Sequence, residues 1–165
     1  MRSLLAEAGG FALAEPAPAD QAALAAADDG AFDVDPDDRP QPPPLGLARA
    51  AVLDAATGQL LGQVSWHQVG YGRTRACAAW NIGIGLLPAA RGRRAGSGAL
   101  RLVARYLFDT TDLDRVEAGT DVDNTAARRA LEAAGFRYEG ALRGAQVRGG
   151  VRRDMAVYGM LRSDE

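Results

Sequence analysis

A seven-residue stretch near the middle of the chain has the composition of a phosphate-binding loop. It reads Arg91-Gly92-Arg93-Arg94-Ala95-Gly96-Ser97. Small residues allow a backbone to approach a ligand closely, and arginine side chains bind phosphate oxygens in a bidentate way. These residue types therefore predict the binding of a phosphorylated ligand.

The residues on either side predict a strand before this loop and a helix after it. Ile82, Ile84 and Leu86 alternate with other residues, as in a strand, and Pro88 ends the run. After the loop, apolar residues recur at positions 100, 103, 104 and 107, which is the spacing of one helix face. The loop thus leads into a helix N-terminus, where backbone N–H groups and the helix dipole favour an anion.

Two common phosphate-binding motifs do not fit this loop. A Walker loop requires a lysine, and the chain contains none. A dinucleotide-binding fingerprint requires a third glycine, but the residue at that position after Gly96-Ser97-Gly98 is Arg101.

The loop resembles the acyl-CoA signature of the GNAT superfamily of N-acetyltransferases, which is Gln/Arg-x-x-Gly-x-Gly/Ala after a strand. Two later segments also resemble this family: Asp123–Ala127, an Asn-bearing strand end, and Glu132–Phe136, a helix end followed by Gly-Phe. The segment Arg153–Tyr158 is similar to the last strand of the RimJ/RimL-type branch, which acetylates ribosomal-protein N termini. The resemblance covers roughly residues 48–161.

The resemblance implies acetyl-CoA as the acyl donor, and it implies no metal. The strand end, with Leu86 and Leu87, would offer backbone groups to the pantetheine arm, and loop 91–97 would take the pyrophosphate. Asn124 occupies the position of an Asn that holds the cofactor arm in the family. The same residue is also predicted to cap a helix, and the two roles are compatible. Arg94 replaces the first glycine of the family loop, which leaves its geometry open.

The resemblance is weaker for the proton-transfer groups. Many relatives carry a glutamate where this chain has Asn81, and an amide orders water or an acceptor but is not a base. His67 is the single histidine, and histidine is the residue type whose unperturbed pKa lies near neutrality. It is therefore a candidate base beside Asn81. Many relatives place a tyrosine acid at the position of Leu131, so Tyr138 and Tyr158 are the alternatives.

Periodicity along the chain predicts one α/β domain over residues 1–165. An acidic, proline-rich segment at 28–44 is predicted to be irregular. By resemblance the domain has the GNAT fold, a mixed and twisted central sheet flanked by helices. The predicted strands are 11–14, 48–53, 60–68, 77–87, 115–121, 136–142 and 151–161. The predicted helices are 20–27, capped by Asp20, then 97–108 and a third that Asn124 or Thr125 caps and Gly135 ends.

Composition and charge narrow the class of protein further. The chain has 165 residues, 47% of them hydrophobic, which is enough for one core. One His and one Cys exclude a zinc cluster. The single Cys77, predicted to be a small core residue at a strand start, fits a reducing compartment, so a cytoplasmic location is expected. Residues 1–45 carry nine acids and two Arg, a net of −7, and residues 46–165 carry twelve acids and seventeen Arg, a net of +5.

These observations predict an N-acyltransferase that moves an acetyl group from acetyl-CoA to a primary amine of a small molecule or a protein N terminus. One alternative is an acyl donor borne by a carrier protein or by tRNA, which Arg101 and Arg105 would suit. Another is a non-catalytic acyl-CoA-binding module, which Asn81 and Leu131 favour. The expected partners are a small-molecule or peptide amine, with no membrane, and nucleic acid only as a tRNA donor. The expected state is a monomer or homodimer.

The acidic segment has two possible roles. Residues 28–38 contain six Asp, and the corresponding part of the family fold borders the acceptor site. They are predicted either to attract a cationic acceptor or to form a solvated, disordered loop.

Overall fold

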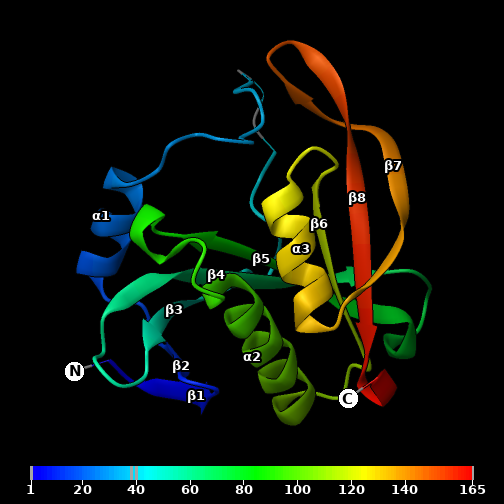
Figure 1. The fold of residues 1–165 in the computed structure, drawn as a ribbon. Coiled ribbons are helices and arrows are strands. Elements are labelled where there is room, and N and C mark those ends of the chain that lie inside the picture. The colour runs from blue at the N-terminus through cyan, green and yellow to red at the C-terminus, as the bar shows by residue number, and fades with distance from the viewer. Residues whose placement is uncertain (1, 38, 40, 165) are drawn as a thin grey trace.

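The computed structural model describes residues 2–37, 39 and 41–164, and they form an eight-stranded mixed sheet with three α-helices (Figure 1). The strand order is β1-β2-β3-β4-β5-β6-β8-β7. The strands are β1 (Leu4–Ala8), β2 (Phe11–Ala14), β3 (Ala48–Asp54), β4 (Leu60–Gly70), β5 (Ala78–Leu86), β6 (Arg115–Asp121), β7 (Arg137–Arg148) and β8 (Val151–Leu161). The helices are α1 (Pro18–Ala26), α2 (Ala95–Thr110) and α3 (Thr125–Ala134). This is the predicted α/β class.

Strands β5 and β6 form a fork in the middle of the sheet. They are the parallel neighbours, and their register consists of the pairs Trp80–Val116 and Asn81–Glu117. Beyond Asn81 the described part of β5 has no further partner on β6, while β6 continues along β8 as far as Asp121. The two strands therefore separate toward their carboxyl ends, next to the start of α2.

Helices α2 and α3 lie on the same face of the sheet and bury the main core (Figure 1). The predicted stripe of α2 is buried there with Leu131 and Ala134 of α3. On β6, Val116 and Ala118 belong to this core, so the residues that alternate with them, Glu117 and Gly119, lie on the opposite face.

Most predicted elements are confirmed to within a few residues, and α3 is confirmed in detail. The Asn124 side chain accepts a hydrogen bond from the Ala127 N–H at 3.1 Å, so Asn124 is the N-cap. Gly135 ends the helix with a φ of 101°, in the left-handed region that glycine favours.

One strand was not predicted, and two sequence predictions about local structure are wrong. The additional first strand is β1. Helix α1 begins at Pro18, and Asp20 lies inside its first turn, where its carboxylate accepts the Ala17 N–H at 2.8 Å and pairs with Arg2. Proline is favoured at the first helical position because it has no N–H to satisfy. Cys77 is exposed, in a short 3-10 turn before β5, rather than in the core.

The described part of the acidic segment contains no helix or strand, as predicted. Residues 28–37, which we call the strap, run from the end of α1 to the tip of the β7–β8 hairpin (Figure 1). The Asp35 carboxylate accepts the N–H groups of Gly149 and Gly150, both at 2.7 Å. The Phe32 ring lies 4.8 Å from the guanidinium of Arg148. Asp38 lies outside the described residues.

None of the helices in the described ranges is both long enough and apolar enough to cross a membrane.

Candidate active site

The predicted phosphate loop leads into α2 through two left-handed residues. Gly92 has a φ of 74° and Arg94, the N-cap of α2, has a φ of 62°. The Arg94 side chain makes no capping hydrogen bond to the first turn of the helix in the described structure. The first N–H groups of α2 are therefore not capped by this side chain, which leaves them suited to an anion.

Arg91 is the loop arginine with a defined set of partners. Its guanidinium forms an ion pair with Asp29 of the strap, and its Nε donates to the Leu86 carbonyl at 3.3 Å. The hydrogen bond from Arg91 lowers the pKa of the Asp29 carboxyl. A phosphate that binds Arg91 must therefore compete with a carboxylate that stays ionised at neutral pH. Arg93 and Arg94 are exposed beside it.

The small residues at the start of α2 have packing roles. A Cβ at Gly96 would lie 3.4 Å from the Ala130 Cβ and 3.6 Å from Leu86 Cδ1, so α2, α3 and β5 approach closely there. A Cβ at Gly98 would overlap the ring of Phe11. Ala95 is buried. The glycines that suggested a close ligand are thus also explained by helix packing.

The backbone groups at the end of β5 are partly engaged. The Leu87 N–H donates to the Leu61 carbonyl at 2.9 Å, and the Leu87 carbonyl accepts the Ala90 N–H at 2.9 Å. Leu86 pairs with Gly62 on the β4 side and accepts from Arg91. The pantetheine arm of an acyl donor in the fork would therefore pair with the edge of β5 that faces β6. It would not pair with the backbone N–H or carbonyl of Leu87, which already have partners.

Asn81 and His67 lie side by side, as predicted. They are directly opposite each other in the antiparallel β4–β5 ladder, so both side chains are on the sheet face without α2 and α3. His67 is not at a strand end, because β4 continues to Gly70. Asn81 belongs to the last β5–β6 pair, and its Nδ2 donates to Glu117 Oε1 at 3.3 Å.

Glu117 is the site residue that the sequence analysis missed. Its side chain lies at the base of the fork and only 5% of the residue is exposed. Its Oε2 accepts a hydrogen bond from the Tyr71 hydroxyl at 2.6 Å and from Arg115 Nε and Nη2 at 3.3 and 3.2 Å. The hydrogen bond to Glu117 raises the pKa of Tyr71. One signal was present: a carboxylate inside the short strand Arg115–Asp121, between two apolar residues.

Arg115 links this carboxylate to a second one. Its Nη1 and Nη2 donate to the two oxygens of Glu139 at 2.7 and 2.6 Å, and Nη2 also reaches Glu117. These contacts, first of all the hydrogen bonds to Glu139, raise the pKa of Arg115 and lower the pKa of Glu139. Two carboxylates share one guanidinium, so the group carries a net charge of −1.

A pocket of about 770 Å³ opens beside this charged group, on the sheet face opposite α2 and α3. Most of its polar residues lie near the base of the fork, Asp114 lines it just before β6, and its remaining wall is mostly apolar and comes from β6, β7 and β8. The apolar side chains of that wall include Leu142, Met155, Val157 and Leu161.

Other predicted or considered residues lie elsewhere. Asn124 caps α3, and its side chain makes no other hydrogen bond among the described residues. Arg101 donates to the Ala133 carbonyl at 2.6 Å and so satisfies the end of α3. The Tyr158 hydroxyl donates to Glu132 of α3 at 3.0 Å, on the helix-bearing face of the sheet. Tyr158 is fully buried there and faces away from the pocket.

Comparisons with known proteins place these features in a family context. A family model described as an acetyltransferase (GNAT) domain matches residues 13–137. The chain is 34% identical over 114 residues to the probable N-acetyltransferase YjcK of Bacillus subtilis (strain 168), which is 69% of this chain and 61% of that protein. The chain therefore spans about six-tenths of the length of this curated relative.

Solved structures share the fold at lower identity. A GNAT-family acetyltransferase from Bacillus anthracis superposes with a TM-score of 0.75 at 19% identity, covering 99% of each chain. RimJ from Mycobacterium smegmatis, in complex with CoA-disulfide, superposes with a TM-score of 0.73 at 21% identity, covering 99% of this chain and 86% of that one.

Proposed function

The chain belongs to the GNAT acetyltransferase family, and from this premise we propose that it transfers the acetyl group of acetyl-CoA to a primary amine. The amine belongs to a small molecule or to a protein N terminus. The observation that carries the proposal is the fork between β5 and β6, whose last residue pair brings Asn81 and Glu117 together. Donor and acceptor sites can then meet at one point of the sheet.

The donor side of the fork has features that fit acetyl-CoA. Beyond Asn81, β5 offers a strand edge without a β6 partner in the described chain, and an extended pantetheine arm can pair with such an edge. At the end of this edge lies the first turn of α2 with Arg91, Arg93 and Arg94, which suits a pyrophosphate. When bound, the thioester supplies an activated acyl group.

The acceptor side lies at the base of the fork. Acyl transfer requires a neutral amine held near the thioester carbon; a C–N bond forms, the C–S bond breaks, and the amine proton must leave. We propose that Asn81 orders the amine or a water molecule and that His67, opposite it, accepts the proton. Positioning alone supplies a large part of the rate of such reactions.

The more specific predictions, on family branch, location and oligomeric state, remain proposals. Membership in the RimJ/RimL-type branch is supported by the Arg153–Tyr158 segment, while the RimJ likeness at 21% identity concerns the fold alone. A cytoplasmic location and a monomeric or homodimeric state also stay predictions. The tRNA-donor alternative loses part of its support, because Arg101 already satisfies the end of α3.

The proposal is tested by measuring thiol release from acetyl-CoA with a panel of primary amines, together with calorimetry of donor binding. We expect thiol release that depends on the amine, and a matching acetylated product by mass spectrometry. Arg91→Glu and Gly96→Val should each weaken donor binding by at least about tenfold, since charge-assisted contacts contribute about 1.5–3 kcal/mol and a larger side chain at position 96 would separate α2 from α3.

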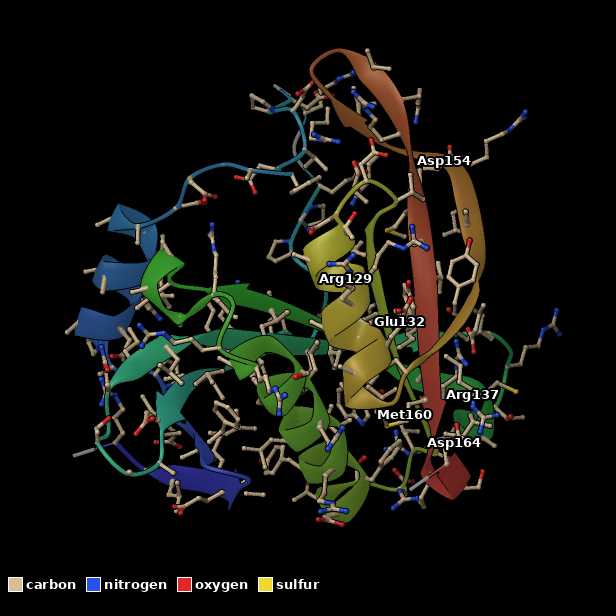
Figure 2. All side chains as sticks on the ribbon, in the orientation of Figure 1. Arg129, Glu132, Arg137, Asp154, Met160 and Asp164 are labelled. Carbon is tan, nitrogen blue, oxygen red and sulfur yellow. The ribbon has the colours of Figure 1, made fainter. Side chains whose placement is uncertain are left out.

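The outcomes distinguish the alternatives. Donor binding without thiol release would favour the non-catalytic binding module, and transfer from a carrier-borne donor alone would favour that alternative. Unchanged acetyl-CoA affinity in both variants would contradict the placement of the donor. Arg137→Glu is the matched control for charge reversal, because Arg137 is an exposed arginine of β7 away from the fork (Figure 2).

A further inference from the structure

One oxygen of the Glu117 carboxylate accepts fewer hydrogen bonds than the other. Its Oε2 accepts three hydrogen bonds, whereas Oε1 accepts one, from Asn81 at a long 3.3 Å, among the described residues. An ionised carboxylate has about four acceptor positions, and Glu117 is nearly fully buried. Burying an ionised group without satisfying it is costly, so a donor group from a ligand fits this oxygen.

The pocket beside Glu117 defines what that donor group must be attached to. The charged group of Glu117, Arg115 and Glu139 carries a net charge of −1 at the fork end of the pocket. The rest of the wall contains Leu142, Met155, Val157 and Leu161, with small residues between them, and also Asp114, whose carboxylate is paired with Arg162. The volume of about 770 Å³ lies within the range of small-molecule sites.

We propose that the acceptor is a small primary monoamine with an apolar body, whose amine nitrogen binds Glu117 Oε1 beside Asn81 while its body lies along the apolar wall of the pocket. This inference rests on the proposed function and names its substrate class. The amine is thereby held at the fork base, where the two strands begin to separate. Glu117 acts as a binding and positioning group, held in place by Tyr71 and Arg115.

The geometry disfavours other amines. A polyamine would place further cationic groups against the apolar wall, where a charge without a partner is costly. An amine with a hydroxyl in its body would find no hydrogen-bond partner for that hydroxyl on the apolar side chains of the wall. Selectivity for the apolar body is thus expected to grow with the length of the alkyl chain, by about 0.8 kcal/mol, or roughly fourfold, for each buried CH₂.

The test compares kcat/KM for n-butylamine, n-hexylamine and 2-phenylethylamine with values for ethanolamine, spermidine and a short alanyl peptide. We expect the three apolar monoamines to exceed the others by at least about tenfold. Glu117→Gln should raise KM for n-butylamine by about tenfold, since it removes a charge-assisted contact, with acetyl-CoA affinity unchanged.

Two further variants separate binding from folding. Leu142→Asn changes a half-exposed wall residue, so the fold should survive; it should lower kcat/KM for n-hexylamine while leaving that for methylamine unchanged. The matched control is Glu132→Gln, because Glu132 also accepts a tyrosine hydroxyl but lies on α3, outside the pocket (Figure 2). Glu132→Gln should change neither the KM for n-butylamine nor the affinity for acetyl-CoA.

Several results would overturn the inference. A preference for spermidine, ethanolamine or the peptide would overturn it while the proposed function stands, and so would an unchanged KM in Glu117→Gln. A concentration-dependent dimer that Leu142→Asn dissociates would show that a second copy of the chain occupies the wall, which also overturns it. Absence of thiol release with every amine would overturn the proposed function as well.

Discussion

Arg94 holds a backbone conformation that is unfavourable for a residue with a Cβ. Its φ of 62° lies in the left-handed region, which costs a residue other than glycine about 1–2 kcal/mol. The family loop that this chain resembles has a glycine there. The exposed Arg94 side chain forms no capping bond in the described structure that would offset this cost.

Arg94→Gly should therefore raise the free energy of unfolding, by up to about 1 kcal/mol after the added flexibility of the unfolded chain is subtracted. Urea denaturation would measure the change. Arg93→Gly is the matched control, since Arg93 is exposed and outside the left-handed region; it should be neutral or destabilising. A destabilisation of equal size in both variants would mean that residue 94 is not strained.

Asn81 determines how many carboxylates meet at the fork. In Asn81→Glu, a second carboxylate would lie near Glu117 Oε1, which is 3.3 Å from the present Asn81 Nδ2. Repulsion between like charges raises the pKa of such a pair. A group whose pKa is raised by folding keeps its stability below the unfolded pKa and loses it as the pH rises through the folded value.

The melting temperature of Asn81→Glu should thus match that of the uncharged control Asn81→Gln near pH 4 and fall below it toward pH 8. Thermal unfolding across this range measures the difference. The raised pKa would also give position 81 a base that works nearer neutral pH. Parallel pH curves for the two variants would show that residue 81 does not interact with Glu117.

The strap and the phosphate loop compete for the same arginine. An exposed ion pair stabilises only weakly, so Asp29→Asn should raise the affinity for acetyl-CoA by no more than about fivefold. The gain should shrink with added salt. Because Arg91 lowers the pKa of Asp29, the competing pair persists at neutral pH and is lost only as the pH falls through the folded pKa of Asp29.

Calorimetry at low and high salt measures this competition. Asp33→Asn is the control, because Asp33 lies in the same strap and makes no ion pair with Arg91 in the described structure. Equal donor affinities in the wild-type chain and Asp29→Asn at low salt would mean that the Asp29 pair does not oppose donor binding.

Elements with a clear local pattern were predictable from the sequence. Helix α3 has a cap, an apolar stripe and a terminal glycine, and all three signals lie within twelve consecutive residues. The short edge strand β1 has mixed alanines and a glutamate, so its strand character depends on pairing with β2. The start of α1 was misplaced because Asp20 resembles a cap residue in sequence, whereas its carboxylate faces back to Ala17 and Arg2.

Features that join distant segments were not predictable. Two of the Glu117 contacts come from distant segments: Tyr71 follows β4 and Asn81 lies on β5, and the sheet brings both beside β6. A single glutamate between Val116 and Ala118 gives the pattern of an ordinary solvent-facing strand residue. The fork could not be predicted from the sequence either. The periodicity of a strand indicates the sheet face on which a residue lies, but it does not indicate where two strands stop pairing.

At the scale of the whole molecule, the strap connects the two sides of the fork. It meets the phosphate loop at Asp29 and the β7–β8 hairpin at Asp35. Asp29 and Asp35 thus already have partners, while attraction of a cationic acceptor by the segment remains a prediction.

The strap also has a consequence for the order of folding. The contacts of Asp35 with Gly149 and Gly150 span 114 and 115 positions in the sequence. Both donors belong to the turn between β7 and β8, so these contacts require the hairpin to be in place. The anchors of the strap are exposed hydrogen bonds rather than buried apolar contacts. The strap is therefore expected to dock last and to detach first, in a local opening that leaves the sheet folded.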